Sequence, residues 1–279
     1  MTTPLVSSNW LEKHLNDPGV RVLEISRSKY LRTYRKGHVP GAQFAYWKSL
    51  CWHESDREFV SSEEMARRLG AMGIGPASTL VLYGDPAQHA AYAFWALSMA
   101  GHRDLRILDG SRTKWAMEGR PLSTETPVVF PVPYPTPSPG DVSMRVGRDY
   151  VRARLGHPGV VLVDARSPEE YRGLRVASYR ARNNCGAERT GRIPGARHLY
   201  FRNLLNEDDT FRSRSDLRAV FEEVGARPEA EEIIGYCRLS HRATLTWFVA
   251  KFLLGYENFK VYDGSWTEWG SIVGFPIEK

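Results

Sequence analysis

The chain has 279 residues and a formal net charge of +6. This length accommodates two domains of ordinary size, each with its own core. No apolar run approaches the ~20 residues of a membrane span, and arginine is spread through both halves without a basic helix. We therefore expect neither a membrane nor a nucleic-acid partner.

Short β-branched runs predict strands in both halves, each followed by a segment with helical spacing. In the first half we expect a strand over Val20–Ile25 and a helix over Ser62–Leu69. In the second half we expect a strand over Val160–Asp164 and a helix over Asp216–Val224. Strands that alternate with helices indicate an α/β fold with parallel sheets covered on both faces.

The chain repeats itself at a constant offset. Gly37–Ala42 recurs as Gly191–Ala196, and Asp109–Trp115 recurs as Asp263–Trp269, both 154 residues on (191 − 37 and 263 − 109). This period is too long for a solenoid and fits two tandem domains. A proline-rich stretch separates the copies, so we predict domains over residues 1–126 and 141–279 joined by an extended linker over 127–140.

The cysteines and the N-terminus predict a cellular compartment. The three cysteines, Cys51, Cys185 and Cys237, are widely spaced, which argues against a disulfide framework and against a zinc site. The first nine residues lack a charged segment followed by an apolar one, so we expect no signal peptide. These features predict a cytoplasmic protein without a metal or cofactor.

One cysteine lies where a reactive thiol is expected. Cys237 follows the apolar run Ile233–Tyr236, and a helix is expected over Thr244–Leu254 after six loop residues. The N–H groups and dipole at a helix start favour an anion. Arg238 and Arg242 add positive charge, so this setting favours the thiolate. A small buried cysteine that merely ends a strand is the alternative.

The spacing of this loop argues against a cysteine phosphatase. Such an enzyme needs Cys-x5-Arg so that the loop curls around a phosphate that the arginine grips with two hydrogen bonds. Here four residues separate Cys237 from Arg242, and Tyr236 stands where many phosphatases have His. The tighter loop suits a single sulfur atom carried on the cysteine.

These motifs resemble the rhodanese family of sulfurtransferases. Cys237–Ala243 is similar to the family's active-site loop, Gly37–Ala42 to its first signature and Tyr262–Trp269 to its C-terminal signature. The resemblance covers essentially the whole chain. It implies two tandem rhodanese-like domains, each a parallel sheet flanked by helices, and a cysteine that carries sulfane sulfur as a persulfide.

The duplication indicates which half performs the chemistry. When Val81–Asp85 is aligned with Ile233–Cys237, an offset of 152 residues, Asp85 takes the place of Cys237. Neither loop arginine has a cationic counterpart in this alignment. We therefore predict that the first domain is a non-catalytic partner, an asymmetry that the resemblance also implies.

The second half carries an insertion of about 17 residues, Arg172–Arg189, which contains Cys185. In many relatives an arginine directly before the residue equivalent to Tyr171 helps to bind the donor, but this chain has Glu170 there. We predict that the insertion borders the active site and supplies an anion-binding arginine instead. The candidates are Arg175, Arg180 and Arg182.

The resemblance implies a double displacement. The thiolate takes the outer sulfur of a small anionic donor such as thiosulfate, and a thiophilic acceptor such as cyanide or a thiol then removes it. Positively charged and polar loop residues hold the anion, with a further arginine close to the loop. The expected nucleophile is Cys237, and the expected substrate-binding residues are Arg238, Arg242, Ser240, His241 and Arg166.

Alternatives to thiosulfate transfer stay open. Relatives that favour 3-mercaptopyruvate usually have Gly after the cysteine, so Arg238 favours thiosulfate, whereas Ser240 departs from the common loop. A persulfide carrier or sensor that hands sulfur to a protein acceptor fits the same residues. A degenerate binding module is disfavoured by the intact cysteine and both arginines. The sequence does not settle the physiological donor and acceptor or the oligomeric state.

Overall fold

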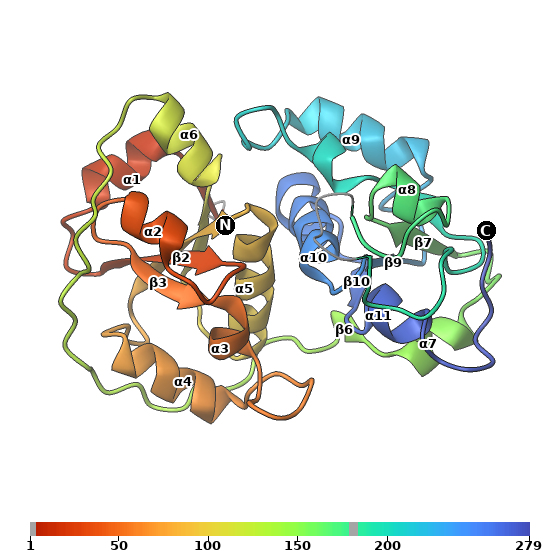
Figure 1. Cartoon of the computed structure of the whole chain (residues 1–279), viewed down its shortest axis with the longest axis horizontal. Coiled ribbons are helices and arrows are strands. Elements are labelled where there is room, and N and C mark those ends of the chain that lie inside the picture. Colours follow the sequence, from red (N-terminus) through yellow and green to blue (C-terminus); the bar gives the residue numbers. More distant parts are fainter. Residues whose placement is uncertain (1–3, 179–183) are drawn as a thin grey trace. The chain divides into compact units, whose positions relative to one another are not determined.

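The computed structural model describes residues 4–178 and 184–279, apart from the side chain of Asp85. The chain divides into two compact units, one of residues up to Val142 together with Glu207–Phe211, the other of Ser143–Asn206 and Arg212–Lys279. Each unit contains a five-stranded parallel sheet flanked by helices (Figure 1). The predicted α/β fold with a parallel sheet in each half is confirmed.

The sheet of the first unit has the strand order β1-β5-β4-β2-β3. Its strands are β1 (Leu5–Val6), β2 (Val20–Ser26), β3 (Gln43–Tyr46), β4 (Thr79–Asp85) and β5 (Leu105–Leu108). Its helices are α1 (Ser8–His14), α2 (Arg32–Lys36), α3 (Trp47–Cys51), α4 (Ser62–Ala71), α5 (Gln88–Met99) and α6 (Ser111–Met117). Its core includes Leu11, Val22, Val81 and Trp115, each at most 4% exposed.

The sheet of the second unit has the order β6-β10-β9-β7-β8, which repeats the first order position by position. Its strands are β6 (Arg145–Val146), β7 (Val160–Asp164), β8 (Arg197–His198), β9 (Glu232–Tyr236) and β10 (Phe259–Tyr262). Its helices are α7 (Arg148–Ala153), α8 (Pro168–Tyr171), the 3₁₀ helix η1 (Phe201–Leu204), α9 (Arg214–Glu223), α10 (His241–Phe248), the π-helix η2 (Val249–Leu254) and α11 (Ser265–Trp269). The sequence repeat therefore has a structural counterpart.

The helix after Cys237 begins earlier than the sequence predicts. We expected it over Thr244–Leu254, but α10 starts at His241 and continues into the π-helix Val249–Leu254. The apolar spacing begins late because the first turn carries His241 and Arg242, polar side chains that are themselves buried. No helix of the described segments is both long and apolar enough to cross a membrane.

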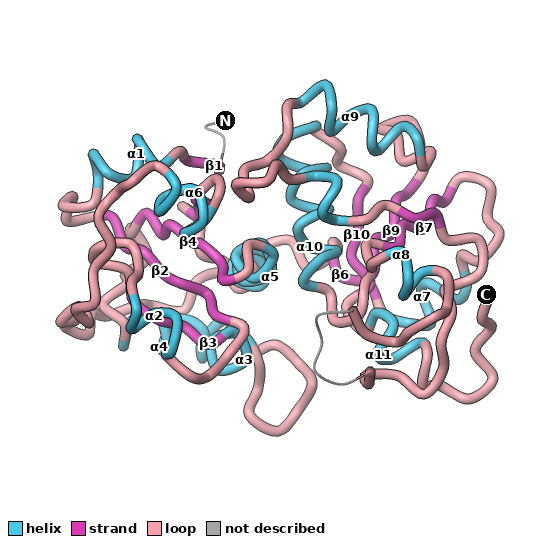
Figure 2. Tube along the Cα trace, turned by 45° about the horizontal axis from the view of Figure 1, so that its top comes forward, coloured by secondary structure: helices cyan, strands magenta, loops and turns pink. Residues whose placement is uncertain are grey.

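The proline-rich stretch 127–140 contains no helix or strand and packs on the first unit (Figure 2). The Val132 N–H donates to the Gly70 carbonyl at 3.0 Å, and the His102 ring bonds the Tyr134 hydroxyl at 2.8 Å. Gly73 also permits a close backbone approach, because a Cβ there would lie 2.9 Å from the Phe130 carbonyl oxygen. The stretch is thus bound along its length to the first unit.

Replacing Gly73 by Ala should destabilise the first unit by introducing a contact with this stretch. Gly119 is a matched control, because both glycines have a φ of +68° but nothing lies within 4 Å of a Cβ on Gly119. We expect Gly119→Ala to lose about 1–2 kcal/mol through left-handed strain and Gly73→Ala to lose about 1–3 kcal/mol more through overpacking. Urea unfolding followed by tryptophan fluorescence measures both. Equal losses would show that the stretch does not press on Gly73.

Candidate active site

Cys237 follows directly after β9, the central strand of the second sheet (Figure 2). The carboxyl ends of parallel strands share one edge of a sheet, which is where such folds place their ligands. The Cys237 side chain is only 1% exposed, so its thiol is recessed below the surface of the loop. Three loop residues then lead to His241, the first residue of α10.

The start of α11 holds the cysteine loop in place. The Cys237 N–H donates to the Ser265 hydroxyl at 3.2 Å, and the Cys237 carbonyl accepts from the Trp266 N–H at 2.9 Å. The Arg238 carbonyl accepts from the Thr267 N–H at 3.1 Å. The C-terminal motif therefore supports the loop through backbone groups.

Ser240 closes the loop through Asp263. Its backbone is left-handed, with a φ of +65°. Its hydroxyl lies 2.5 Å from the Asp263 carbonyl oxygen and 2.6 Å from Oδ1, and Arg145 binds the other carboxylate oxygen at 2.9 Å. The hydroxyl proton is thus directed at Asp263, which gives Ser240 a structural contact in addition to its predicted role at the sulfur.

Three N–H groups of the loop are available for a ligand. Those of Arg238, Leu239 and Ser240 have no acceptor within the described part of the chain. In the first turn of α10, by contrast, the His241 N–H donates to the Leu239 carbonyl at 2.9 Å and the Thr244 N–H donates to the Ser240 carbonyl at 2.7 Å. Successive free N–H groups at a helix start form a site for an anion.

Arg242 forms a buried ion pair with Glu170. Its Nη1 and Nη2 donate to the two carboxylate oxygens at 2.6 and 2.9 Å, and the Glu170 side chain is fully buried. Burial alone would lower the pKa of Arg242, but the hydrogen bonds and charge of Glu170 raise it above its ordinary value. Burial would likewise raise the pKa of Glu170, yet Arg242 holds it below its usual range. A carboxylate therefore already matches the charge of Arg242.

Arg166 is also completely buried. It donates to Asp164 at 2.6 Å and to the Gly191 carbonyl at 2.7 Å, and its guanidinium lies 4.5 Å from the centre of the Trp266 ring. Its Nη1 has no hydrogen-bond partner among the described residues. Arg166 thus joins the end of β7 to the second copy of the Gly37–Ala42 motif.

Arg238 is partly exposed and borders the insertion. Its Nη1 donates to the Cys185 carbonyl at 3.1 Å, and a Cβ added to Gly186 would lie 3.2 Å from the same nitrogen. No carboxylate of the described residues pairs with it. Cys185 and Gly186 of the insertion thus lie beside the cysteine loop, whereas the predicted anion-binding role of the insertion stays a prediction.

The structure describes only one of the three predicted anion-binding arginines of the insertion. Arg180 and Arg182 lie outside the described residues, and Arg175 is partly buried. Arg189 donates to the carbonyls of Trp269, Gly270, Ile272 and Phe275, so it holds the end of α11. That structural role was not predicted, because carbonyl partners about 80 residues away leave no sequence pattern.

The hydrogen bonds of two equivalent tyrosine hydroxyls revise the alignment of the halves. The Tyr83 hydroxyl accepts from the Val39 N–H at 3.3 Å, and the Tyr236 hydroxyl accepts from the Ile193 N–H at 3.1 Å. Val39 and Ile193 occupy the same place in the repeated motif. Tyr83 and Tyr236 are therefore equivalent, an offset of 153 rather than 152 residues.

The residue that follows each of these tyrosines supports the same offset of 153 residues. The Gly84 N–H donates to the Ser111 hydroxyl at 3.3 Å, just as the Cys237 N–H donates to Ser265. We therefore correct the counterpart of Cys237 from Asp85 to Gly84. The sequence misled because the two halves carry Tyr-Gly and Gly-Tyr in opposite order at this place. The first domain still has no thiol at the position.

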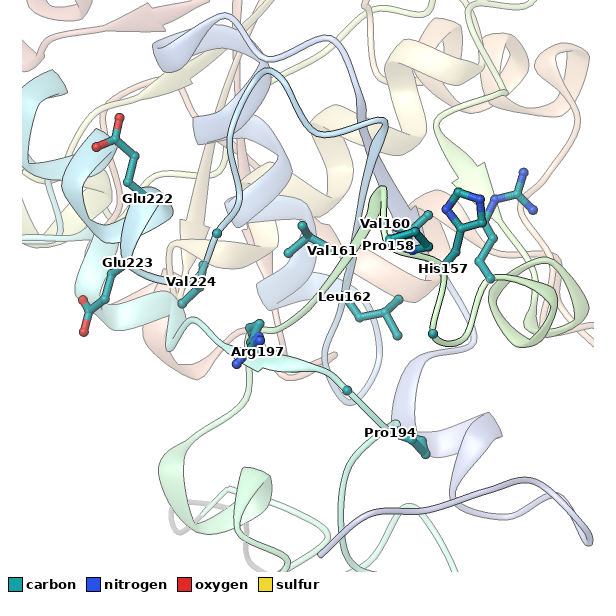
Figure 3. A pocket seen from close by; sticks show the side chains of 14 residues that line it. His157, Pro158, Val160, Val161, Leu162, Pro194, Arg197, Glu222, Glu223 and Val224 are labelled. Carbon is teal, nitrogen blue, oxygen red and sulfur yellow. The ribbon is translucent and has the colours of Figure 1, made fainter.

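A pocket of about 570 Å³ lies elsewhere in the second unit (Figure 3). It is lined by the first residues of β7, by His157 before them and by Arg197 and Glu222. Val160 and His157 lie at the amino end of β7, whereas Cys237 follows the carboxyl end of the neighbouring strand. None of the predicted site residues lines the pocket.

Comparison with known proteins decides the family. The rhodanese-like domain matches residues 7–118 and again residues 148–272. The chain belongs to the rhodanese family. Membership confirms the resemblance inferred from the loop and from the two repeated motifs.

Two curated relatives match nearly the full length. The chain is 44% identical to "Sulfur carrier protein TtuD" of Thermus thermophilus, over 99% of this chain and 96% of that one. It is 41% identical to a protein of Saccharopolyspora erythraea named "Putative thiosulfate sulfurtransferase", over 98% of this chain and 95% of that one.

Solved structures share the fold. YnjE superposes with a TM-score of 0.85 at 26% identity, over 99% of this chain and 68% of that one. An anaerobic ergothioneine biosynthesis enzyme from Chlorobium limicola, in complex with trimethyl histidine, gives a TM-score of 0.84 at 25% identity, over 99% of this chain and 70% of that one.

Substitutions of Ser240 separate its contact with Asp263 from a role at the sulfur. We expect Ser240→Ala to lose about 1–2 kcal/mol of stability, since the hydrogen bond is lost and the left-handed strain stays. Ser240→Gly should lose less, because glycine adopts this backbone without strain, and it should keep most sulfur transfer. Chemical unfolding and a sulfur-transfer assay test this. Equal loss of transfer in both variants at unchanged stability would place the hydroxyl at the sulfur instead.

Proposed function

We propose that this protein transfers sulfane sulfur from thiosulfate, or a similar small anionic donor, to a thiophilic acceptor through a persulfide on Cys237. The observation that carries the proposal is the cysteine loop itself. A recessed thiol lies beside three N–H groups without acceptors, and Arg238 next to it has no carboxylate partner among the described residues. Such a loop binds one anionic sulfur and a negatively charged donor.

In the first half-reaction the Cys237 thiolate attacks the outer sulfur of thiosulfate. The new bond joins the two sulfur atoms, the sulfur–sulfur bond of the donor breaks, and its electron pair leaves with sulfite. Arg238 stabilises the negative charge on the departing sulfite. The loop N–H groups stabilise the persulfide that remains.

In the second half-reaction an acceptor nucleophile attacks the outer sulfur of the persulfide. Cyanide leaves as thiocyanate, a thiol leaves as a persulfide, and the Cys237 thiolate is restored. Donor and acceptor react in separate steps, so the kinetics are expected to be ping-pong.

Arg238 is better suited than Arg242 to hold the sulfo group. The charge of Arg242 is matched by Glu170 on two hydrogen bonds, whereas the side chain of Arg238 donates to the Cys185 carbonyl and is partly exposed. We therefore assign donor binding to Arg238 and support of the loop to Arg242. Ser240 holds the loop to Asp263, and Arg166 holds Asp164 and the Gly191 carbonyl at the end of β7.

A sulfur carrier is the second candidate. It is favoured by the printed name of the Thermus thermophilus relative, at 44% identity. A carrier uses the same Cys237 persulfide but passes its sulfur to a protein acceptor, with little turnover on cyanide. Comparing cyanide with a protein thiol as acceptor separates the two.

Replacing Cys237 by Ser tests the nucleophile. Ser is nearly isosteric, so we expect an intact fold and complete loss of sulfur transfer from thiosulfate to cyanide. The matched control is Cys185→Ser, which removes the exposed thiol of the insertion and should leave transfer nearly unchanged. If the Cys237 variant kept half of its activity, another group would be the nucleophile.

Replacing Arg238 by Gly tests donor choice. The loss of a charge-assisted hydrogen bond should weaken binding of the sulfo group by about 1.5–3 kcal/mol. The ratio of kcat/KM for thiosulfate to that for 3-mercaptopyruvate should fall accordingly. Arg238→Lys, which keeps the charge, should lose less. An unchanged ratio in the Gly variant would remove Arg238 from donor binding.

A further inference from the structure

We propose that residues 184–189 of the insertion form an arm that positions the guanidinium of Arg238, and that Gly186 is the residue of this arm that sets where the guanidinium lies. The inference rests on the proposed function, in which Arg238 binds the sulfo group of the donor. It makes Gly186 a positioning residue for the first half-reaction and gives the insertion a role in the choice of donor.

The arm contacts the side chain of Arg238 directly. The Cys185 carbonyl accepts a hydrogen bond from Arg238 Nη1 at 3.1 Å. A Cβ added to Gly186 would lie 3.2 Å from the same nitrogen, 3.6 Å from Cδ and 3.7 Å from Cζ of Arg238. The backbone of Gly186 therefore lies along the outer half of the arginine side chain. Because the contact uses the backbone of Cys185, it does not require the thiol.

Glycine is needed at position 186 for two separate reasons. Its φ is +115°, a conformation that residues with a side chain rarely adopt. A methyl group at this place would also press on the guanidinium of Arg238, because 3.2 Å is closer than ordinary van der Waals contact. A side chain on residue 186 would therefore move the guanidinium or the arm itself.

The arm is anchored independently of Arg238. The Arg189 side chain donates to four carbonyls of residues 269–275, and the Arg189 carbonyl accepts from Trp266 Nε1 at 3.0 Å. At the other end, Asn184 Oδ1 accepts from the N–H groups of Val176 and Ala177 at 3.0 and 3.1 Å. Both ends of the arm are thus held by other parts of the second unit, so the arm can impose a position on Arg238.

Arg238 is fixed at its backbone and at its tip. Its carbonyl accepts from the Thr267 N–H at 3.1 Å, and its Nη1 is bound by the arm. Its Nε and Nη2 have no partner among the described residues. These two nitrogens share one edge of the guanidinium, which can donate two parallel hydrogen bonds to the oxygens of one anionic group. A side chain ordered before binding also loses less entropy when the donor arrives.

The two half-reactions distinguish a positioning role from a general structural role. In ping-pong kinetics, kcat/KM for each substrate reports on the half-reaction in which that substrate takes part. A residue that acts through Arg238 on the sulfo group should therefore affect kcat/KM for thiosulfate alone. A distorted cysteine loop would lower kcat/KM for both thiosulfate and the acceptor.

The test is the full-length Gly186→Ala variant, assayed with thiosulfate and cyanide. We expect kcat/KM for thiosulfate to fall by about tenfold, since misplacing a binding group by about 1 Å can cost up to about a hundredfold. The value for cyanide should stay within about twofold of wild type, because Gly186 does not act in the second half-reaction. An unchanged value for thiosulfate, or an equal loss for both substrates, would overturn the proposal.

Gly225→Ala is the matched control for backbone strain. Gly225 also belongs to the second unit and has a φ of +75°, but nothing lies within 4 Å of a Cβ at this position. Both values of kcat/KM should therefore stay at the wild-type level. If Gly225→Ala lowered kcat/KM for thiosulfate as much as Gly186→Ala does, strain rather than contact with Arg238 would be the cause, and the proposal would fail.

A double variant shows whether Gly186 acts through Arg238. In the Arg238→Gly background there is no guanidinium to displace, so Gly186→Ala should cause no further loss of kcat/KM for thiosulfate. A further loss of the same size as in the wild type would contradict the proposal. If Arg238→Gly itself left thiosulfate kinetics unchanged, the proposed donor site would fail. If Arg238→Gly lowered them and Gly186→Ala did not, only this inference would fail.

Asn184→Ala keeps the test decisive if Gly186→Ala does not fold. Asn184 is exposed, and its truncation removes both hydrogen bonds that fix the start of the arm without altering the cysteine loop. We expect the same pattern, a lower kcat/KM for thiosulfate with an unchanged value for cyanide. Wild-type kinetics with both substrates in the folded Asn184→Ala variant would show that the arm does not position Arg238.

Discussion

The candidate site depends on the hydrogen bonds that residues 263–267, at and just before the start of α11, form with the cysteine loop. Backbone and hydroxyl groups of residues 263–267 engage three of the four loop residues: Cys237 with Ser265 and Trp266, Arg238 with Thr267, and Ser240 with Asp263. Without these bonds, a loop with a left-handed serine and several unpaired N–H groups would have little reason to keep one shape. One of these hydrogen bonds has an equivalent in the first unit, where the Ser111 hydroxyl accepts from the Gly84 N–H. The first unit thus has a similar contact at a position where it has Gly84 in place of the thiol.

Charge pairing gives the site its second constraint. Three carboxylates each pair with one arginine near the loop: Asp263 with Arg145, Asp164 with Arg166, and Glu170 with Arg242. Breaking a buried pair by removing one partner typically costs about 3–5 kcal/mol, because a buried charge is left without compensation. These pairs therefore fix the geometry, and the lack of a carboxylate partner for Arg238 among the described residues supports its proposed role in donor binding.

The sequence predicts those features that have a local or repeated pattern. The strand Val160–Asp164 appears with the predicted bounds, and the apolar run before Cys237 places the thiol at a strand end. Glu170 and Arg242 are 72 residues apart, so no periodicity or spacing could show which loop arginine is neutralised. The swapped order of Tyr and Gly in the two halves hid the true counterpart of Cys237, which the hydrogen bonds of the tyrosine and serine hydroxyls reveal. Arg189 has carbonyl partners, which carry no side-chain identity in the sequence.

The central claim is that Cys237 carries the transferred sulfur atom. The most direct measurement is peptide mass mapping of the full-length protein after incubation with thiosulfate, before and after addition of cyanide. The account predicts one additional sulfur atom on the peptide that contains Cys237, and its loss on cyanide with an equal amount of thiocyanate formed. Sulfur on the Cys185 peptide, or no sulfur on any cysteine while thiocyanate is still produced, would contradict it.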